Sequence, residues 1–254
     1  MNKRSAQEWL RRWDLQQEGY MPFREERFRT MGDALDVLFK GPFTALDLGC
    51  GPGSLSVRMI ERFPRVKMIG VDHDPVMLKI GQNALGDIHG HMKWIDADIS
   101  SPGWEQCLGV SRFDAVLSTT AIHWLKPQDL RHLYPTLGKI VRKGGVFMNG
   151  DHFPFGKDWP KTAKLSDTWL LNNAKKDFHS SHAQNWDQWW NSIEKDPEFS
   201  SEFAERHRRY HSTHHSHQAR LPPEAHARYL KAAGFREVAV IWQHLDNRVL
   251  MALR

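Results

Sequence analysis

The feature that most constrains the fold is a short apolar segment that runs directly into a glycine-rich turn. The segment begins at Thr44, and the turn that follows carries glycine at three alternate positions, Gly49, Gly51 and Gly53. Glycine has no Cβ, so the backbone there can bend sharply and lie close to a ligand. A second apolar run ends in Asp72, 19 residues after Gly53. A carboxylate at that distance, at the end of the neighbouring strand, is placed to accept hydrogen bonds from ribose hydroxyls. The pattern predicts a nucleoside site built from two adjacent strand ends.

The spacing of the glycines indicates which nucleoside is bound. Dinucleotide-binding folds favour Gly-x-Gly-x-x-Gly, whereas the third glycine here comes one residue earlier, after Pro52. The segment Leu46-Asp-Leu-Gly-Cys-Gly-Pro-Gly53 resembles the first motif of the class I S-adenosylmethionine-dependent methyltransferases. The resemblance continues in the family's order through residues 70–78, 94–99, 113–118 and 143–147, and ends in a C-terminal strand pair. It covers residues 40–150 densely, and the tail from about residue 222.

Strands alternate with helices along most of the chain, which predicts an α/β fold with a parallel sheet. Proline at the first turn marks helix starts at Asp74-Pro75 and Lys126-Pro127. Strands are expected at 44–49, 67–72, 91–95, 113–118, 144–150, 236–243 and 248–253, and helices at 53–63, 75–86, 127–142 and 223–233, with a short one near 102–108. The family resemblance implies a Rossmann-like, doubly wound, seven-stranded sheet of order 3-2-1-4-5-7-6 with the last strand antiparallel.

Two regions lie outside this alternation. Residues 1–43 are interpreted as an N-terminal helical lid, with a first helix capped by Ser5 and Glu8 and a second helix starting at Pro22. Residues 151–222 are rich in Trp, His and Lys and show no strand pattern, so they are interpreted as a helical cap that holds the substrate. The methyltransferase core is then formed by residues 44–150 and 223–254.

The resemblance implies that the cofactor is S-adenosyl-L-methionine. In the family the glycine turn passes beneath the amino-acid part of the cofactor, and a carboxylate after the second strand accepts hydrogen bonds from the ribose hydroxyls. The resemblance gives that second role to Asp72. Asp47 would organise the turn or meet the cofactor ammonium. Asp98 matches the residue that accepts from the adenine amino group, the alternative being a loop aspartate that caps the next helix. The expected cofactor-binding residues are Asp47, Gly49, Cys50, Gly51, Gly53, Asp72, His73, Asp98, Ile99, Thr119, Tyr20 and Arg24.

The segment after the fourth strand is expected to face the reacting methyl group, because ligands in such sheets lie beyond the carboxyl ends of the strands. Its Ala121-Ile-His-Trp124 stretch resembles small-molecule members of the family, including trans-aconitate methyltransferase-like proteins. His123 and His152 are the candidates for a catalytic general base, since imidazole titrates near working pH. The alternative is that each histidine shapes the pocket wall through hydrogen bonds. A base is also dispensable in many methyl transfers, because alignment supplies much of the rate.

The remaining candidates come from the lid and the cap. Tyr20, Arg24 and Arg27 could close over the cofactor, and the alternative for the arginines is an exposed helix surface. The expected substrate-binding residues are Trp124, Trp186, Trp190 and His215. His211 and His215 have the i, i+4 spacing of a zinc pair, but arginines surround the stretch 207–217 and a solvated cap segment is favoured, so no metal is expected.

Composition sets bounds on the partners. The net charge of +5 allows nucleic acid as a partner without requiring it, and the Asn/Asp-Pro-Pro-Tyr motif of base-modifying enzymes is missing from the sequence. The two cysteines form no disulfide framework, and no apolar run is long enough to span a membrane. No secretory signal is expected either, so we expect a cytoplasmic protein. We expect it to be a monomer or a homodimer. The expected activity is transfer of a methyl group to O or N of a small molecule. Alternatives are an RNA methyltransferase, a cyclase that uses the same cofactor, and a non-catalytic binding protein.

Overall fold

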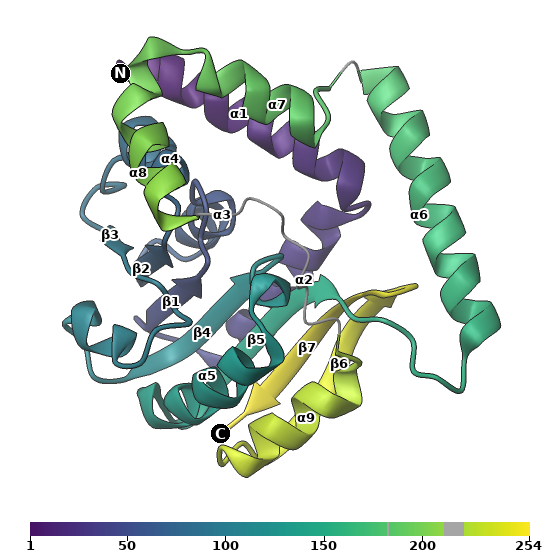
Figure 1. Ribbon diagram of the computed structural model, residues 1–254. Helices are drawn as coiled ribbons and strands as arrows, with labels where there is room; N and C mark the ends of the chain where they lie inside the picture. The colour runs from purple at the N-terminus through teal and green to yellow at the C-terminus, as the bar shows by residue number, and fades with distance from the viewer. Residues whose placement is uncertain (182, 211–220) are drawn as a thin grey trace.

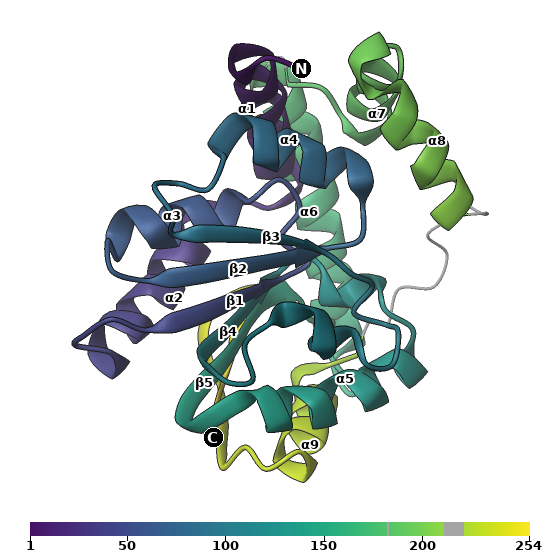
Figure 2. The same ribbon diagram turned by 90° about the vertical axis from the view of Figure 1, so that its left-hand side faces the viewer.

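A single mixed sheet of seven strands organises the chain. The computed structural model describes residues 1–181, 183–210 and 221–254, and its strands lie in the order β3-β2-β1-β4-β5-β7-β6 (Figures 1 and 2). The predicted strand order and the antiparallel last strand are confirmed, because β7 runs antiparallel to both β5 and β6 while the other pairings are parallel. The strands are β1 (Thr44–Leu48), β2 (Lys67–Asp72), β3 (Met92–Asp96), β4 (Phe113–Thr119), β5 (Val141–His152), β6 (Glu237–His244) and β7 (Asn247–Leu253).

The described helices occur close to the predicted positions, with two different starts. Asn2 caps the first helix by accepting from the backbone N–H of Ser5, so the predicted Ser5–Glu8 capping box is wrong. Pro22 precedes the second helix, which begins at Arg24 after Phe23 in a left-handed conformation. The helices are α1 (Lys3–Tyr20), α2 (Arg24–Leu38), α3 (Ser54–Arg62), α4 (Pro75–Leu85), α5 (Pro127–Ile140), α6 (Pro160–Ser181), α7 (Trp186–Glu194), α8 (Ser200–Arg209) and α9 (Pro223–Ala232), with short 3₁₀ turns η1 (Trp104–Leu108), η2 (Ile122–Trp124) and η3 (Pro197–Phe199).

The two faces of the sheet are covered by different helices. Successive strand residues point to opposite faces, so Leu46 and Leu48 pack with α5 and α9, whereas Ala45 packs with α2 and α3. Tyr134 from α5 and Phe28 from α2 are the largest buried apolar side chains that these helices contribute. Burying an aliphatic or aromatic side chain of this size stabilises the fold by roughly 1.5 to 3 kcal/mol. The sheet is therefore a rigid platform whose strand ends are free to carry a site.

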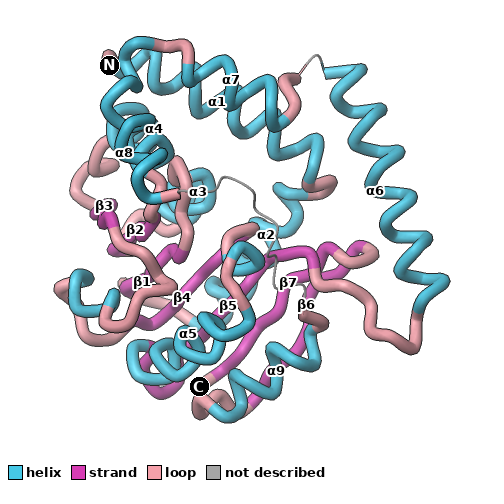
Figure 3. The backbone as a smooth tube through the Cα atoms, viewed as in Figure 1, coloured by secondary structure: helices cyan, strands magenta, loops and turns pink. Residues whose placement is uncertain are grey.

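A third apolar cluster contains no strand residues. It joins α1, α4, α7 and α8 through Trp9, Ile80, Trp189 and Phe203, and we call it the cap cluster. The rings of Trp9 and Trp189 meet edge to face with centroids 5.8 Å apart. Helices α1 and α7 lie side by side in Figure 1, while α6 runs along the right-hand side in Figures 1 and 3 and meets the end of α1 where the rings of Tyr20 and Phe178 lie 4.8 Å apart. Helix α1 is thus packed with the cap, and α2 with the sheet.

Within the described residues, no helix combines the length and the apolar character needed to cross a bilayer.

Candidate active site

The glycine turn and the end of β2 are joined by one carboxylate. Asp72 accepts from the backbone N–H of Gly51 through Oδ2 at 2.7 Å, and from those of His73 and Asp74 through Oδ1 at 2.8 Å each. The three turn glycines all have positive φ, between 53° and 89°. The structure therefore brings together the two strand ends that the sequence pattern paired. Asp72 thus makes the contacts to the turn that were one of the two roles expected of Asp47, and the other role, a contact with the cofactor ammonium, stays a prediction.

Space around the glycines differs from one position to the next. A Cβ on Gly49 would lie 2.3 Å from the Cβ of Ala121, in the loop after β4, whereas a Cβ on Gly51 would meet no atom within 4 Å. Gly53 is restricted like Gly49, because its Cβ would lie 2.5 Å from the ring of Trp94. The surface of Gly51 is thus the part of the turn that a ligand can approach.

This difference leads to a prediction about stability. Gly51→Ala is expected to cost about 1 to 2 kcal/mol, since alanine resists a positive φ. Gly49→Ala is expected to cost about 1 to 3 kcal/mol more, because the added methyl also overlaps Ala121. Urea unfolding of the two variants and the wild type measures the difference. Equal losses in both variants would contradict the close contact between the turn and the loop after β4.

Two carboxyl groups under the turn are perturbed by their surroundings. Asp47 is buried, and burial raises its pKa to about 7, while Ser56 donates to its Oδ2 at 2.7 Å. Within the described part of the chain, the buried Oδ1 of Asp47 has no hydrogen-bond partner. Burial also raises the pKa of Asp72, to about 6. An unsatisfied buried carboxylate oxygen favours a nearby cationic or hydrogen-donating ligand group.

The other residues expected around the nucleoside have mixed surroundings. Asp98 accepts from the N–H and hydroxyl of Ser100 and from the hydroxyl of Ser101, so its carboxylate does make the local contacts of a loop-capping aspartate. Burial alone would raise the pKa of Asp98, but these hydrogen bonds hold it below its usual value. Cys50 fills the space beneath the turn against Gly70, and burial raises the pKa of its thiol. Ile99 is partly buried against the core.

The lid arginines are buried, so the alternative of an exposed helix surface is wrong. The guanidinium of Arg24 donates to Asp14 at 2.9 Å, and the hydroxyl of Ser54, at the start of α3, donates to the same oxygen at 2.6 Å. Asp14, which the sequence analysis missed, therefore links the lid to the glycine turn. Tyr20 lies at the junction with the cap, where its hydroxyl accepts from the backbone N–H of Trp186 at 2.9 Å.

His123 is paired with a buried carboxylate. Its Nδ1 lies 2.7 Å from Oδ1 of Asp151, at the end of β5. Burial favours protonation of this carboxylate, but the charge and hydrogen bond of His123, with the charge of Arg27, hold the pKa of Asp151 below its usual value. An ionised carboxylate only accepts, so Nδ1 carries the proton and Nε2 is the accepting atom of neutral His123. Asp151 was also missed by the sequence analysis, although it lies directly before His152.

Arg27 supports this pair from inside the fold. Its guanidinium donates to the hydroxyl of Thr119 at 2.9 Å, the carbonyl of Gly150 at 2.8 Å and the side chain of Asn247 at 2.6 Å. Burial lowers the pKa of Arg27 to about 10, so it remains a cation at neutral pH. A Cβ on Gly150 would lie 2.3 Å from Cδ of Arg27, which explains why this position of β5 is a glycine. The hydroxyl of Thr119 is thus already engaged by Arg27.

His152 forms a second pair with a carboxylate. Its Nδ1 lies 3.2 Å from Oδ2 of Asp246, in the turn between β6 and β7. Burial alone would raise the pKa of Asp246, but His152 holds it below its usual value. The backbone N–H of His152 also donates to Asp151 at 2.8 Å. Asp151 therefore contacts the ring of His123 and the backbone of His152.

Aromatic rings connect His123 to the cap. The ring of Trp124 lies 4.7 Å from that of His123 and 6.2 Å from that of Trp186, measured between centroids. Trp190 lies deeper in the cap, beneath the guanidinium of Arg206 at 4.0 Å. The structure thus brings Trp124 and Trp186 together next to His123. His215 lies outside the described residues.

The structure describes only part of the histidine-rich stretch. His207 is exposed and its Nε2 lies 3.5 Å from Glu194, whereas His211, His214, His215 and His217 lie outside the described residues. Among the residues that are described, no group of three or more His, Cys, Asp or Glu side chains could hold a metal ion.

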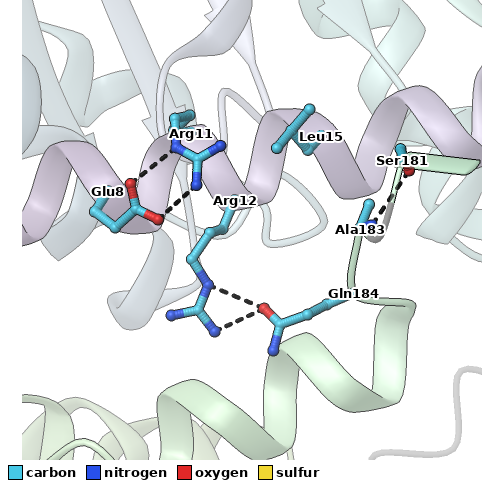
Figure 4. A pocket seen from close by; sticks show the side chains of 7 residues that line it. All are labelled: Glu8, Arg11, Arg12, Leu15, Ser181, Ala183 and Gln184. Carbon is cyan, nitrogen blue, oxygen red and sulfur yellow. Dashed lines mark hydrogen bonds and ion pairs between the residues drawn. The ribbon is translucent and has the colours of Figure 1, made fainter. Parts of the chain in front are cut away.

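Two hollows lie at the cap rather than at the strand ends. One, of about 400 Å³, is lined by α1 and the connection between α6 and α7, where Arg12 donates to Gln184 (Figure 4). The other is an open groove of about 1340 Å³ that includes Tyr20 and Phe178. Neither is lined by residues of the glycine turn or by His123. We therefore locate the candidate site from the side chains at the strand ends.

Comparisons with known proteins show what the sheet-forming part of the chain is similar to. Residues 45–145 match the model of a family described as a methyltransferase domain. A trans-aconitate 2-methyltransferase from Azoarcus sp. (strain BH72) is 34% identical over 138 residues, which are 53% of this chain and 48% of that protein. The chain thus spans about half the length of the curated relatives it matches.

Solved structures show the same fold at low sequence identity. An O-methyltransferase family protein from Burkholderia thailandensis superposes with a TM-score of 0.57 at 14% identity, covering 89% of this chain and 55% of that one. Human N-acetylserotonin methyltransferase, solved in complex with SAM, gives a TM-score of 0.54 at 15% identity, covering 97% and 66%.

Proposed function

We propose that this protein, whose residues 45–145 match the model of a methyltransferase domain, is a class I S-adenosylmethionine-dependent methyltransferase that transfers a methyl group from S-adenosylmethionine to an oxygen or nitrogen atom of a small molecule. The observation that carries the proposal is the placement of Asp72 across the glycine turn, with the His123–Asp151 pair at the neighbouring strand ends. The second product is S-adenosylhomocysteine.

The residues under the turn fit this cofactor. The buried Oδ1 of Asp47 lacks a partner among the described residues, and the surface of Gly51 is open, so a cationic ammonium and a sulfonium can be accommodated there. Asp72 is partly exposed at the end of β2, and we propose that it accepts from ribose hydroxyls in addition to its backbone contacts. When bound, the cofactor supplies an activated methyl group on a good leaving group.

The chain's own residues then align the acceptor and move its proton. Trp124 and Trp186 are proposed to hold the acceptor through apolar contact, since aromatic side chains offer a large rigid surface. Nε2 of His123 is the proposed base for a hydroxyl or ammonium proton, and Asp151 fixes its tautomer and stabilises the imidazolium that forms. Arg27 keeps the end of β5 in place. Alignment itself supplies a large part of the rate.

Cofactor affinity is expected to depend on pH. Asp47 and Asp72, with pKa values of about 7 and about 6 in the free protein, are partly protonated at pH 6, and a cationic ligand favours their ionised forms. Binding should therefore release protons, and affinity should rise between pH 5.5 and 7.5 by at most about tenfold per pH unit for each proton released. Calorimetry at pH 6.5 in two buffers of different ionisation enthalpy measures the release.

The control for this pH effect is Asp47→Asn, which should bind more weakly and release fewer protons. The same dissociation constant at pH 5.5 and 7.5, with no proton release, would contradict the role of these two carboxylates.

Product analysis tests the function directly. The protein is incubated with S-adenosylmethionine and a panel of small organic acids, phenols and amines, and S-adenosylhomocysteine is quantified by mass spectrometry. Acceptor-dependent S-adenosylhomocysteine with a methylated product supports the proposal, and failure to bind either form of the cofactor overturns it. Salt-dependent RNA binding together with RNA methylation would favour an RNA methyltransferase. A cyclised product would favour a cyclase. Cofactor binding without turnover would favour a non-catalytic binding protein.

Other expectations stay predictions. They are the boundaries of the lid, core and cap at residues 43, 150 and 222, a monomer or homodimer, and the cytoplasmic location.

A further inference from the structure

The last turn of helix α8 is fastened to the ends of two strands. Both Nη atoms of Arg209 lie 2.7 Å from the carboxylate oxygens of Asp96, at the end of β3. Nη1 of Arg209 also donates to the carbonyl of His73, the residue after β2, at 2.8 Å. A bidentate guanidinium–carboxylate contact fixes both distance and orientation. One cap side chain therefore bridges the two strand ends that flank the proposed nucleoside site.

A second arginine makes the same connection deeper in the fold. Nε of Arg206 donates to Oδ2 of Asp74 at 2.8 Å, and both residues are buried. Asp74 is the N-cap of α4, because its Oδ1 accepts from the backbone of Val76 and Met77. Losing one partner of a buried ion pair is strongly unfavourable, unlike losing a pair at the surface. The position of α8 is thus tied to the start of α4, two residues after Asp72.

Tyr210 follows these arginines and is placed against the same strand ends. Its ring meets the ring of His73 edge to face with centroids 5.8 Å apart, and the guanidinium of Arg206 lies 5.3 Å from its centroid. Burial and the negative charges of Asp74, Asp72 and Asp98 raise the pKa of Tyr210, so its hydroxyl stays neutral. The side chain therefore lies near the two carboxylates expected to meet ribose and adenine.

From these contacts we propose that Tyr210 is a cofactor-binding residue, a wall of the nucleoside pocket supplied by the cap, and that Arg209 holds it in place through Asp96. The proposal rests on the proposed function, since the ligand is the adenosyl group of that cofactor. A tyrosine ring offers apolar contact to a purine, with a neutral hydroxyl for a polar edge. Because α8 also packs in the cap cluster through Phe203, cofactor affinity and the position of the cap become coupled.

Calorimetric titration with S-adenosylhomocysteine tests the assignment. Tyr210→Ala and Arg209→Ala are each expected to weaken binding by about tenfold, a change of the size that one lost aromatic or ion-pair contact produces. Tyr210→Phe keeps the ring and should stay within about threefold of the wild type. The matched control is Arg208→Ala on the same helix. The side chain of Arg208 is 75% exposed and pairs with Glu205, so this variant should bind S-adenosylhomocysteine as tightly as the wild type.

Asp96→Asn removes the same ion pair from the strand side, where the carboxylate is 44% exposed and the risk to folding is small. It should weaken binding, though less than Arg209→Ala because Arg209 keeps its contact with the carbonyl of His73, and the double variant should bind no more weakly than Arg209→Ala. If Tyr210→Ala, Arg209→Ala and Asp96→Asn all bind like Arg208→Ala, the inference is overturned. If the wild type itself binds no S-adenosylhomocysteine, the proposed function fails instead, so the two failures are distinguishable.

Discussion

Replacing His123 by alanine is expected to lower kcat by about 10²- to 10⁴-fold, the usual contribution of a positioned general base. The physical reason is the 2.7 Å contact between Nδ1 of His123 and Asp151, which leaves Nε2 as an accepting atom of fixed orientation. The dissociation constant of S-adenosylhomocysteine should change little, because His123 lies on the loop after β4 and not on the glycine turn. Single-turnover rates and calorimetry separate the two quantities.

Asp151→Asn and His152→Ala complete this test. Asp151→Asn should lower kcat, because the 2.7 Å contact with Asp151 fixes the tautomer and orientation of the His123 ring. His152→Ala should cost less than about tenfold, since His152 pairs at 3.2 Å with the turn between β6 and β7, further from β4. Unchanged rates in His123→Ala and His152→Ala would show that the transfer proceeds without a base.

Asp72→Ala is expected to weaken binding of S-adenosylmethionine by at least about 100-fold. The carboxylate accepts from three backbone N–H groups, and each donor left without a partner costs about 1 to 3 kcal/mol. The turn would lose its shape at the same time as the ribose loses its acceptor. The dissociation constant from calorimetry, with a melting curve to confirm folding, gives the measurement.

A second aspartate provides the matched control for Asp72. Asp98→Ala removes contacts that are local to Ser100 and Ser101, so we expect a loss nearer tenfold, consistent with one or two hydrogen bonds. Should both variants lose affinity equally, Asp72 would have no special role in the turn.

The sheet could be predicted from the sequence because its signals are local. Each strand is a short apolar run, and each helix start at Pro75 and Pro127 is marked within a few residues, as the structure confirms. The start of α1 was missed for an equally local reason, since Asn2 and Ser5 are both competent caps and Asn2 forms the observed one. The helical nature of the cap followed in the same way from its missing strand pattern.

The partners in the site could not be predicted, because they are distant in the chain. Asp151 lies 28 residues from His123, and Arg27 lies 220 residues from Asn247, so no spacing rule connects them. Buried arginines are also rare, which is why the sequence favours an exposed helix surface for Arg24 and Arg27. Asp72 and the glycine turn were an exception, since their separation of about 20 residues is that of one βαβ unit.

The cap cluster has a consequence for the order in which the chain assembles. It unites the first helix with residues near 190, and the indole of Trp9 donates to Asp196, which lies 187 positions further along the chain. Closing so long a loop is entropically costly, and no strand pairing offsets that cost among the described residues of the cap cluster. The seven strands can therefore be complete while α1, α7 and α8 are still apart, and hydrogen exchange in these three helices should outpace that in β1 and β4.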